Sequence, residues 1–173
     1  MSAALQPRFS FDDWLAIERT ATDQRCEYVA GEVFAMAGGS EEHNLIVANV
    51  VRELGNQLKG RPCRVYPSDM KVHIAAADVG VYPDVMVICG EREFHDGRRD
   101  VVYYRSLHSL QAYLLLSQER MQAELFLRQP DGTWSLSSYQ ESSESIPLPV
   151  VEAELSLAEV YDKVEWIASD ARG

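Results

Sequence analysis

The chain has 173 residues, of which 16 are Lys or Arg and 27 are Asp or Glu, so its formal net charge at pH 7 is -11. An acidic chain is not drawn to nucleic acid or to a membrane surface by its overall charge, because both are polyanionic, although a local basic groove remains compatible with this balance. The length fits one domain with a sizeable core. We predict this domain over residues 10–165, with short tails at 1–9 and 166–173.

The three cysteines, Cys26, Cys63 and Cys89, are far apart and form no C-x-x-C pair. This spacing is not that of a zinc ribbon or of a disulfide framework, so we expect buried free thiols in a reducing compartment. No apolar run reaches the length of a membrane span, and residues 1–8 contain no apolar core of a signal peptide. These features predict a cytoplasmic protein without a membrane partner.

Hydrophobic periodicity and turn residues predict the elements in chain order. Ser10 and Ser40 are good N-caps for the first two helices, and Ala30-Gly31 makes a hairpin turn. Helices are predicted over 11–20, 41–59 and 157–167, strands over 25–29, 32–37, 63–66, 69–74, 83–89, 110–117, 121–128 and 134–139, a loop over 75–80 and an extended linker over 146–149.

Asp84 follows Pro83 and precedes the apolar run Val85–Cys89, which fits a buried central strand. Proline suits the first residue of a strand because it has no N–H for the ladder. A carboxylate at the mouth of such a strand is costly unless it is paired or holds a cation. Two interpretations stay open: a solvated or capped aspartate, or a metal ligand at the edge of a sheet.

Two further positions are candidates for a site. His43 opens the apolar stripe of the second helix, where it is either a packing histidine or an imidazole beside a reaction centre. Asp69 and Lys71 alternate with apolar residues and so share one face of a strand. That face is either solvated or, if a neighbouring strand brings Asp84 beside it, part of a one-metal site.

Several short motifs follow one another in a characteristic order along the chain. They are Glu27-Tyr28-Val29, Gly31-Glu32-Val33, Ser40-Glu41-Glu42-His43, Ser68-Asp69-Met70-Lys71-Val72, Tyr82-Pro83-Asp84-Val85, Tyr104-Arg105-Ser106-Leu107 and Gln129-Pro130-Asp131-Gly132-Thr133-Trp134. This order resembles the bacterial "putative restriction endonuclease" family of the PD-(D/E)XK nuclease superfamily. The resemblance implies an α/β (α+β) fold of the restriction-endonuclease type, with a mixed β-sheet core flanked by helices.

The resemblance also implies hydrolysis of a DNA phosphodiester that depends on Mg²⁺ or Mn²⁺. In such chemistry two carboxylates hold a hard cation, and a lysine stabilises the developing charge. By resemblance Asp84 is the first carboxylate, His43 the histidine at the helix start, and Asp69 an acidic position on the preceding strand. The candidate catalytic residues are therefore Asp84, His43 and Lys71, and the candidate metal ligands are Asp84 and Asp69.

One departure from the family is large. The family carries a Val-Glu-Val-Leu-Ser type strand and a lysine before the Tyr-Arg-Ser-Leu segment, whereas here Asp100–Tyr103 runs directly into that segment. Judged by the family's pattern, roughly 25 to 30 residues are missing here, more than one mean strand with its loop. The central strand, the second carboxylate and the lysine go with them, and residues 101–104 are the candidate to fill part of the gap.

We therefore predict a catalytically impaired member of the family. The alternatives are a non-catalytic interaction or DNA-binding module, homodimeric through an exposed sheet edge, and an incomplete record of a longer active protein. A basic segment gives the DNA hypothesis a candidate surface, although its arginines can equally pair with the acids among them. This segment comprises Arg92, His95, Arg98, Arg99 and Arg105, interleaved with Phe94, Tyr103 and Tyr104.

Overall fold

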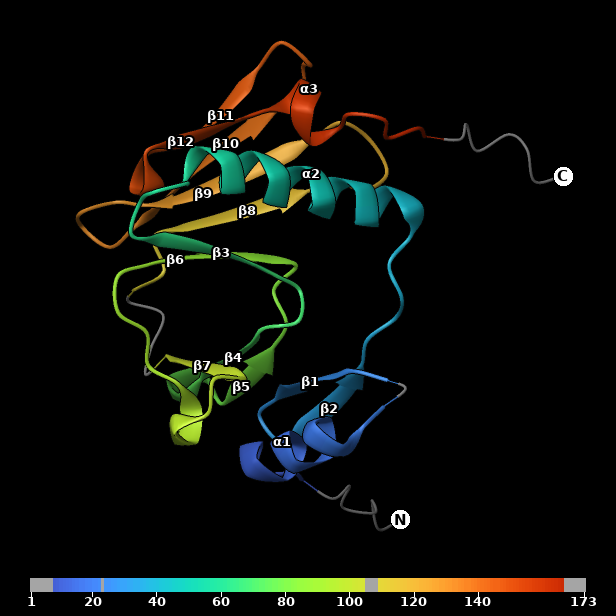
Figure 1. Ribbon diagram of the computed structural model, residues 1–173, viewed down its shortest axis with the longest axis vertical. Helices are drawn as coiled ribbons and strands as arrows, with labels where there is room; N and C mark the ends of the chain where they lie inside the picture. The colour runs from blue at the N-terminus through green and yellow to red at the C-terminus, as the bar shows by residue number, and fades with distance from the viewer. Residues whose placement is uncertain (1–7, 23, 105–108, 167–173) are drawn as a thin grey trace, which may run out of the picture. The chain divides into compact units, whose positions relative to one another are not determined.

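The computed structural model describes residues 8–22, 24–104 and 109–166 (Figure 1). The chain divides into two compact units, each assembled from three separate stretches of sequence. Unit 1 comprises Met1–Gly38, Ser68–Pro83 and Arg92–Ser109, and unit 2 comprises Gly39–Pro67, Asp84–Glu91 and Leu110–Gly173. The expectation of one domain over 10–165 stays a prediction.

Unit 1 is a five-stranded mixed sheet with one helix. Its elements are α1 (Phe11–Thr20), β1 (Cys26–Val29), β2 (Glu32–Ala35), β4 (Lys71–Ile74), η1 (Ala75–Ala77), β5 (Val79–Val81), η2 (His95–Gly97) and β7 (Val101–Tyr104). The strand order is β2-β1-β5-β4-β7. Strand β7 runs parallel to β4, and the other pairs are antiparallel. The short strand expected over 101–104 is confirmed.

Helix α1 begins as the sequence predicts. Ser10 and Asp13 form a capping box, in which each side chain accepts a hydrogen bond from the other residue's backbone N–H. Trp14 is fully buried, and its indole N–H donates to the Cys26 carbonyl at 2.9 Å. Ile17 of this helix is exposed, whereas the charged Glu18 is buried.

Both carboxylate oxygens of the buried Glu18 accept a hydrogen bond. One oxygen accepts the Cys26 N–H at 2.9 Å, and the other accepts the hydroxyl of Tyr82. A buried carboxylate is tolerable only with such partners. Helix α1 is therefore bound to the sheet by polar contacts as well as by its aromatic side chains, and the apolar pattern of the helix alone could not predict this.

Strand β5 replaces the loop predicted over 75–80. The expectation failed because Gly80 weakens the strand pattern, yet Gly80 is what lets the helix approach the sheet. A Cβ placed on Gly80 would lie 2.6 Å from Cζ3 of Trp14 and 2.9 Å from Cε2 of Phe11. Glycine within a strand often marks such a close approach.

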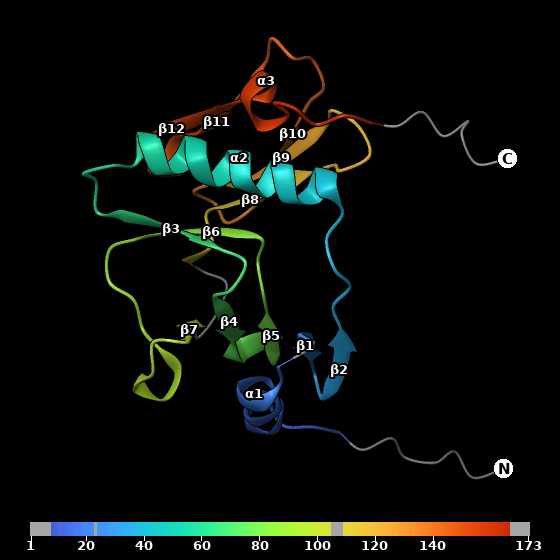
Figure 2. The same ribbon diagram turned by 45° about the vertical axis from the view of Figure 1, so that its right-hand side comes forward.

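Unit 2 carries the second helix and three small sheets (Figure 2). Its elements are α2 (Glu41–Gln57), β3 (Cys63–Pro67), β6 (Val85–Cys89), β8 (Ala112–Leu116), β9 (Ala123–Arg128), β10 (Trp134–Tyr139), β11 (Ser145–Leu148), η4 (Pro149–Val151), β12 (Ala153–Ser156) and α3 (Leu157–Val160). Strands pair antiparallel as β3-β6, β8-β9-β10 and β11-β12. The expected strand after Pro83-Asp84 is confirmed as β6, although among the described residues it pairs with β3 alone.

The core of unit 2 gathers one face of α2 with β9, β11, β12 and α3. Helix α2 also buries Asn49, whose side-chain amide donates to the carbonyls of Val160 and Asp162 at 3.0 Å each. These bonds connect the helix to the end of the chain and explain why a polar residue lies on the buried face. No helix in the described ranges is both long and apolar enough to cross a membrane.

Two expectations for the end of the chain were wrong. The extended linker over 146–149 is largely strand β11, in which Ile146 is fully buried. Pro147 is tolerated there because among the described residues β11 pairs with β12 alone, as an edge strand can. Helix α3 ends at Val160 rather than at 167, a position outside the described residues.

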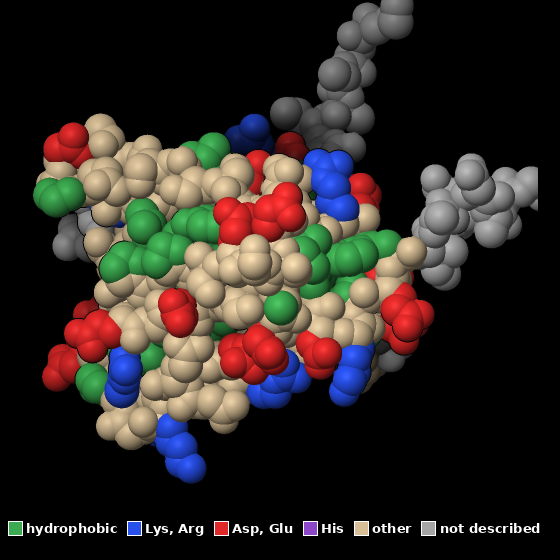
Figure 3. Space-filling model, turned by 90° about the horizontal axis from the view of Figure 1, so that it is seen from above, with side chains coloured by type: hydrophobic (Ala, Val, Ile, Leu, Met, Phe, Trp, Pro, Cys, Tyr) green, Lys and Arg blue, Asp and Glu red, His purple; other side chains and the backbone are tan. Residues whose placement is uncertain are grey.

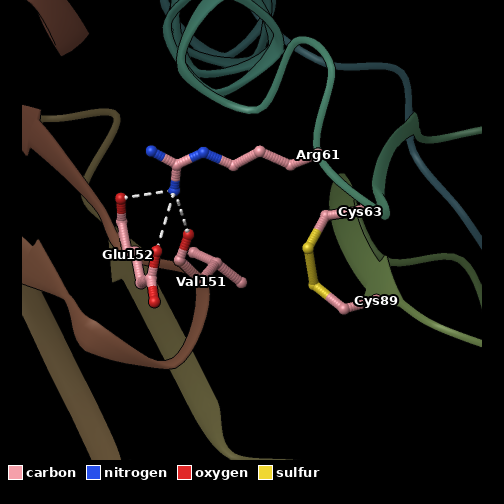
Figure 4. Close-up of a disulfide and its surroundings, with 5 residues drawn as sticks. All are labelled: Arg61, Cys63, Cys89, Val151 and Glu152. Carbon is pink, nitrogen blue, oxygen red and sulfur yellow. Dashed lines mark hydrogen bonds and ion pairs between the residues drawn. A yellow bond between two sulfur atoms is a disulfide. The ribbon is translucent and has the colours of Figure 1, made fainter.

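Cys63 and Cys89 form a disulfide, which corrects the expectation of free thiols (Figure 4). They lie directly opposite each other on β3 and β6, with Cα atoms 4.0 Å apart. The Gly90 N–H donates to the Pro62 carbonyl beyond them, so they are a non-hydrogen-bonded pair, in which side chains approach most closely. Twenty-six residues separate them in sequence, so spacing alone gave no signal. Cys26 is free.

Candidate functional site

The candidate site in unit 2 is the pair His43 and Asp84. Nε2 of His43 lies 3.3 Å from Oδ1 of Asp84, and the two side chains are 33% and 57% exposed. His43 is the third residue of α2, and Asp84 directly precedes β6. The structure thus brings together two residues, 41 positions apart, that the sequence nominated separately.

The helix cap fixes the start of α2 and with it the position of His43. The Ser40 hydroxyl oxygen accepts the His43 N–H at 3.2 Å and donates its own proton to Oε1 of Gln118 at 3.1 Å. A histidine in contact with a carboxylate at a partly exposed position is a common arrangement for general acid–base chemistry. The pair is therefore equipped for proton transfer with a ligand that reaches this surface.

The other two predicted site residues, Asp69 and Lys71, lie in unit 1, where each contacts a neighbouring side chain. Asp69 forms an ion pair with Arg25 and lies in the turn before β4, which begins at Lys71. The Lys71 ammonium lies 5.4 Å from the centroid of the Tyr82 ring, and the Arg25 guanidinium lies 5.6 Å from it. Both cations thus contact one aromatic ring at cation–π distance.

Arg19 binds two acids of the segment that follows β6. Its guanidinium contacts Asp100 through two bonds of 2.9 and 3.1 Å and reaches Asp96 at 3.1 Å. The Arg19 hydrogen bonds lower the pKa of both carboxyl groups. Sequence reasoning missed this contact, because Arg19 is 77 and 81 residues away from its partners and lies at the end of a helix where any cation is favourable.

A second group of polar contacts in unit 1 is a chain of three side chains, of which His73 is buried and Asp12 is exposed. Nδ1 of His73 lies 3.3 Å from Nδ1 of His95, whose Nε2 lies 3.2 Å from Asp12. His73 is 8% exposed and stacks on Phe11. Burial, and then the neighbouring His95, lower the pKa of His73. His73 follows the same alternation as Asp69 and Lys71, for which a solvated face was one interpretation, and its burial shows that this face is covered at His73.

Among the residues that the structure describes, neither unit by itself offers the donor set that a resident Mg²⁺ needs. Mg²⁺ prefers oxygen ligands in octahedral geometry, but Asp84 is one carboxylate beside an imidazole, and Asp69 is paired with an arginine. Within the described ranges, no three His, Cys, Asp or Glu side chains gather closely enough to hold a metal ion. Asp69 and Asp84 belong to different units, so their joint role as ligands stays a prediction.

The comparison with known proteins agrees with the resemblance. Residues 11–103 match the family described as "Putative restriction endonuclease", which is more than half of the chain. This chain belongs to that family. This match confirms the family resemblance predicted from the sequence.

Two relatives come from Synechocystis sp. strain PCC 6803, and both are described as uncharacterized. Protein sll1609 is 30% identical over 149 residues, covering 72% of this chain and 84% of the relative. Protein slr1290 is 28% identical over 158 residues, covering 79% of this chain and 83% of the relative. An alignment of 149 residues that spans only 72% of a 173-residue chain includes residues of the relative without a counterpart here.

A solved structure shows the same fold. It is a crystal structure described as "a putative nuclease belonging to DUF820" from Anabaena variabilis ATCC 29413, with a TM-score of 0.70 and 16% sequence identity. The similarity covers 88% of this chain and 97% of that chain. The predicted fold class, an α/β (α+β) arrangement with a mixed sheet and flanking helices, is confirmed.

Proposed function

We propose that this family member is a catalytically impaired nuclease, which keeps the first part of a phosphodiester-cleaving site and lacks the rest. The observation that carries the proposal is the double contact of Arg19 with Asp96 and Asp100. These are the aspartates that follow Asp84 before β7, and both accept hydrogen bonds from the same guanidinium. Neither is free to replace the missing second carboxylate without giving up a charge-assisted bond.

The sequence of β7 supports the same proposal. This strand takes the place next to β4 in the sheet and reads Val-Val-Tyr-Tyr, without a carboxylate or a lysine. The length of the alignment with sll1609 also favours an internal deletion in this chain. Metal-dependent hydrolysis of a phosphodiester needs more than one acidic ligand, so we expect His43 and Asp84 alone to give little or no cleavage.

DNA is the proposed ligand because of the family, and the contact would be local rather than driven by net charge. Acidic side chains are scattered between apolar patches on the face drawn in Figure 3. The segment after β6 supplies cations instead, among them Arg92, whose guanidinium lies 5.7 Å from the centroid of the Phe94 ring. Arg98 and Arg99 are exposed. Arg105 lies outside the described residues.

The test is a cleavage assay on plasmid and single-stranded DNA with Mg²⁺ and with Mn²⁺. The wild-type chain is compared with Asp84→Ala, and with Glu165→Gln as a matched loss of an exposed negative charge. We expect no cutting above background from any of the three folded proteins. Cutting by wild type and Glu165→Gln that disappears in Asp84→Ala would show a working metal site and refute impairment.

A second candidate function is a homodimeric interaction module. The register of β8, β9 and β10 aligns Tyr113, Phe126 and Leu136 in one cross-strand row. Tyr113 is 53% exposed and Leu136 54%, although large apolar side chains in a row usually pack against something. Strand β8 thus has one exposed face.

Sedimentation over a range of concentrations, with and without a chelator, tests this candidate. A dimer through this row would survive chelation and would dissociate in the double variant Tyr113→Ser with Leu136→Ser. Ile17→Ser is the control, because it removes an exposed apolar side chain from unit 1 instead. A monomer at every concentration would remove the dimer hypothesis and leave DNA binding.

A further inference from the structure

We infer that the Cys63–Cys89 disulfide is a redox-sensitive lock on the part of the chain that carries Asp69, Lys71 and Asp84. This inference goes beyond the proposed function and does not depend on any cleavage activity. It rests on the position of the bond in the chain, on the contacts on either side of it and on its accessibility.

The disulfide closes a covalent ring of the chain that contains three of the four candidate site residues, Asp69, Lys71 and Asp84. Cys63 begins β3 and Cys89 ends β6, and the two strands pair from Cys63↔Cys89 to Pro67↔Val85. The segment between these strands, Ser68–Pro83, belongs to unit 1, and the chain returns to unit 2 at Asp84. This segment, which includes β4 and β5, therefore lies within the covalent ring.

The two sides of the bond are anchored unequally. Beside Cys63, the Arg61 guanidinium donates to the carbonyls of Val151 and Glu152 at 3.1 and 2.8 Å, which attaches the start of β3 to η4 and the turn after it (Figure 4). Beside Cys89, the chain makes the Gly90–Pro62 backbone bond and then leaves unit 2 after Glu91. Once the disulfide is open, we expect the end of β6 to loosen first.

This loosening would reach the candidate site through a short strand. Strand β6 is five residues long, and Asp84 directly precedes it. Most of β6 is only partly buried. When the bond is absent, the strand is held by the backbone ladder, by the buried Ile88 and by Val85 and Val87, which are partly buried and pack against the core of unit 2. A frayed β6 would reduce the time that Asp84 spends in contact with His43, which stays fixed on α2 by its cap.

The chemistry of opening is an ordinary thiol–disulfide exchange with a dithiol reductant. Cys89 is exposed and Cys63 is partly buried, so the reductant thiolate attacks Sγ of Cys89. The S–S bond breaks, and Sγ of Cys63 leaves with the electron pair and takes a proton. The second thiol of the reductant then attacks the mixed disulfide, releases Cys89 as a thiol and leaves the reductant oxidised. Two electrons and two protons pass to the protein, and an oxidised dithiol reverses the reaction.

Hydrogen exchange measured by mass spectrometry tests the lock directly. Wild type is compared before and after reduction with dithiothreitol, alongside the double variant Cys63→Ser with Cys89→Ser. We expect amides of residues 86–91 to exchange more than about tenfold faster after reduction, with β9 unchanged. The double variant should match reduced wild type and should not respond to dithiothreitol.

Cys26→Ser is the matched control, because it removes the free thiol and keeps the bond. It should respond as wild type does, and reoxidation with oxidised dithiothreitol should restore the slow exchange. Alkylation of Cys63 and Cys89 in unreduced protein would refute the bond. Equal exchange in the oxidised and reduced states would refute the lock and leave an inert crosslink.

Discussion

Gly80 gives the sharpest test of how unit 1 is packed. We expect Gly80→Ala to destabilise unit 1, because its new Cβ would meet two aromatic rings on α1. It would lie 2.6 and 2.8 Å from Cζ3 and Cη2 of Trp14, and 2.9 Å from Cε2 of Phe11. Ordinary carbon contacts are about 3.5–4.0 Å, so the helix or its rings must move by about 1 Å.

The rings have little freedom to move. Trp14 is fully buried and held by the bond from its indole N–H to the Cys26 carbonyl. Overpacking of a well-filled core costs about 1–3 kcal/mol, and the loss of unfolded-state freedom returns about 0.4–1 kcal/mol. We expect the free energy of unfolding to fall by roughly 1–2 kcal/mol as the net of these two terms.

Gly55→Ala is the matched control with the opposite sign. Gly55 is exposed within α2, and nothing lies within 4 Å of the added Cβ. Replacing glycine in a helix interior stabilises by about 0.5–1 kcal/mol. Urea unfolding gives the total change, and hydrogen exchange separates β1 and β5 from α2. A neutral or stabilising Gly80→Ala would refute the packing of α1 on β5.

Three other predictions concern pairs described above. The pKa of Asp100 is lowered by Arg19, so the stability that this pair contributes is present above the ordinary pKa of 3.8 and is lost as pH falls below it. In Arg19→Gln, the loss of folded structure on acidification, followed by circular dichroism, should therefore depend less on pH in this range. The pKa of His73 is lowered by burial, so the folded state resists its protonation and stability should fall as pH drops below 6.5. In His73→Gln, thermal unfolding should then vary less between about pH 7.5 and 5.5, a window below the ordinary pKa of cysteine and above those of the carboxyl groups. Removing the 26-residue crosslink with Cys63→Ser and Cys89→Ser should lower the free energy of unfolding in urea by about 3.5 kcal/mol.

Each of these has an outcome that contradicts it. An unchanged acid titration in Arg19→Gln would mean that its bonds to the aspartates add no stability. A pH dependence of His73→Gln equal to that of wild type would show that the effect does not come from His73. If the two serine substitutions lower the free energy of unfolding by less than about 1 kcal/mol, either the disulfide is already reduced in wild type or the unfolded chain keeps structure that limits its entropy.

The sequence predicted best where the signal is local. Ser10 before an amphipathic run gave α1, and Ala30-Gly31 gave the first hairpin, in which both residues have positive φ. His43 and Asp84 were chosen separately from the sequence and lie in contact in the structure, while their role in a site stays a prediction. In each case the signal in the sequence lies within a few residues of the position itself, and the contact between His43 and Asp84 was not predicted from it.

The failures involve partners that are far away in the chain. Arg19 finds Asp100 across 81 residues, and Cys63 finds Cys89 across 26. His73 alternates like a surface residue but is buried under Phe11, which comes from α1. Only the three-dimensional arrangement brings these groups together, and no period or spacing in one sequence encodes it.

The alternation of the chain between its two units has a consequence for synthesis. Helix α2 is complete once residue 57 is made, but the groups that cover it come from β12 and α3; its Gln57, for example, exchanges two hydrogen bonds with the backbone of Glu154. The apolar face of α2 must therefore wait for about a hundred further residues to leave the ribosome, at roughly 5–20 residues per second. For those seconds an unprotected helix is presented to the cell, and chaperones have their clearest opportunity to bind this protein.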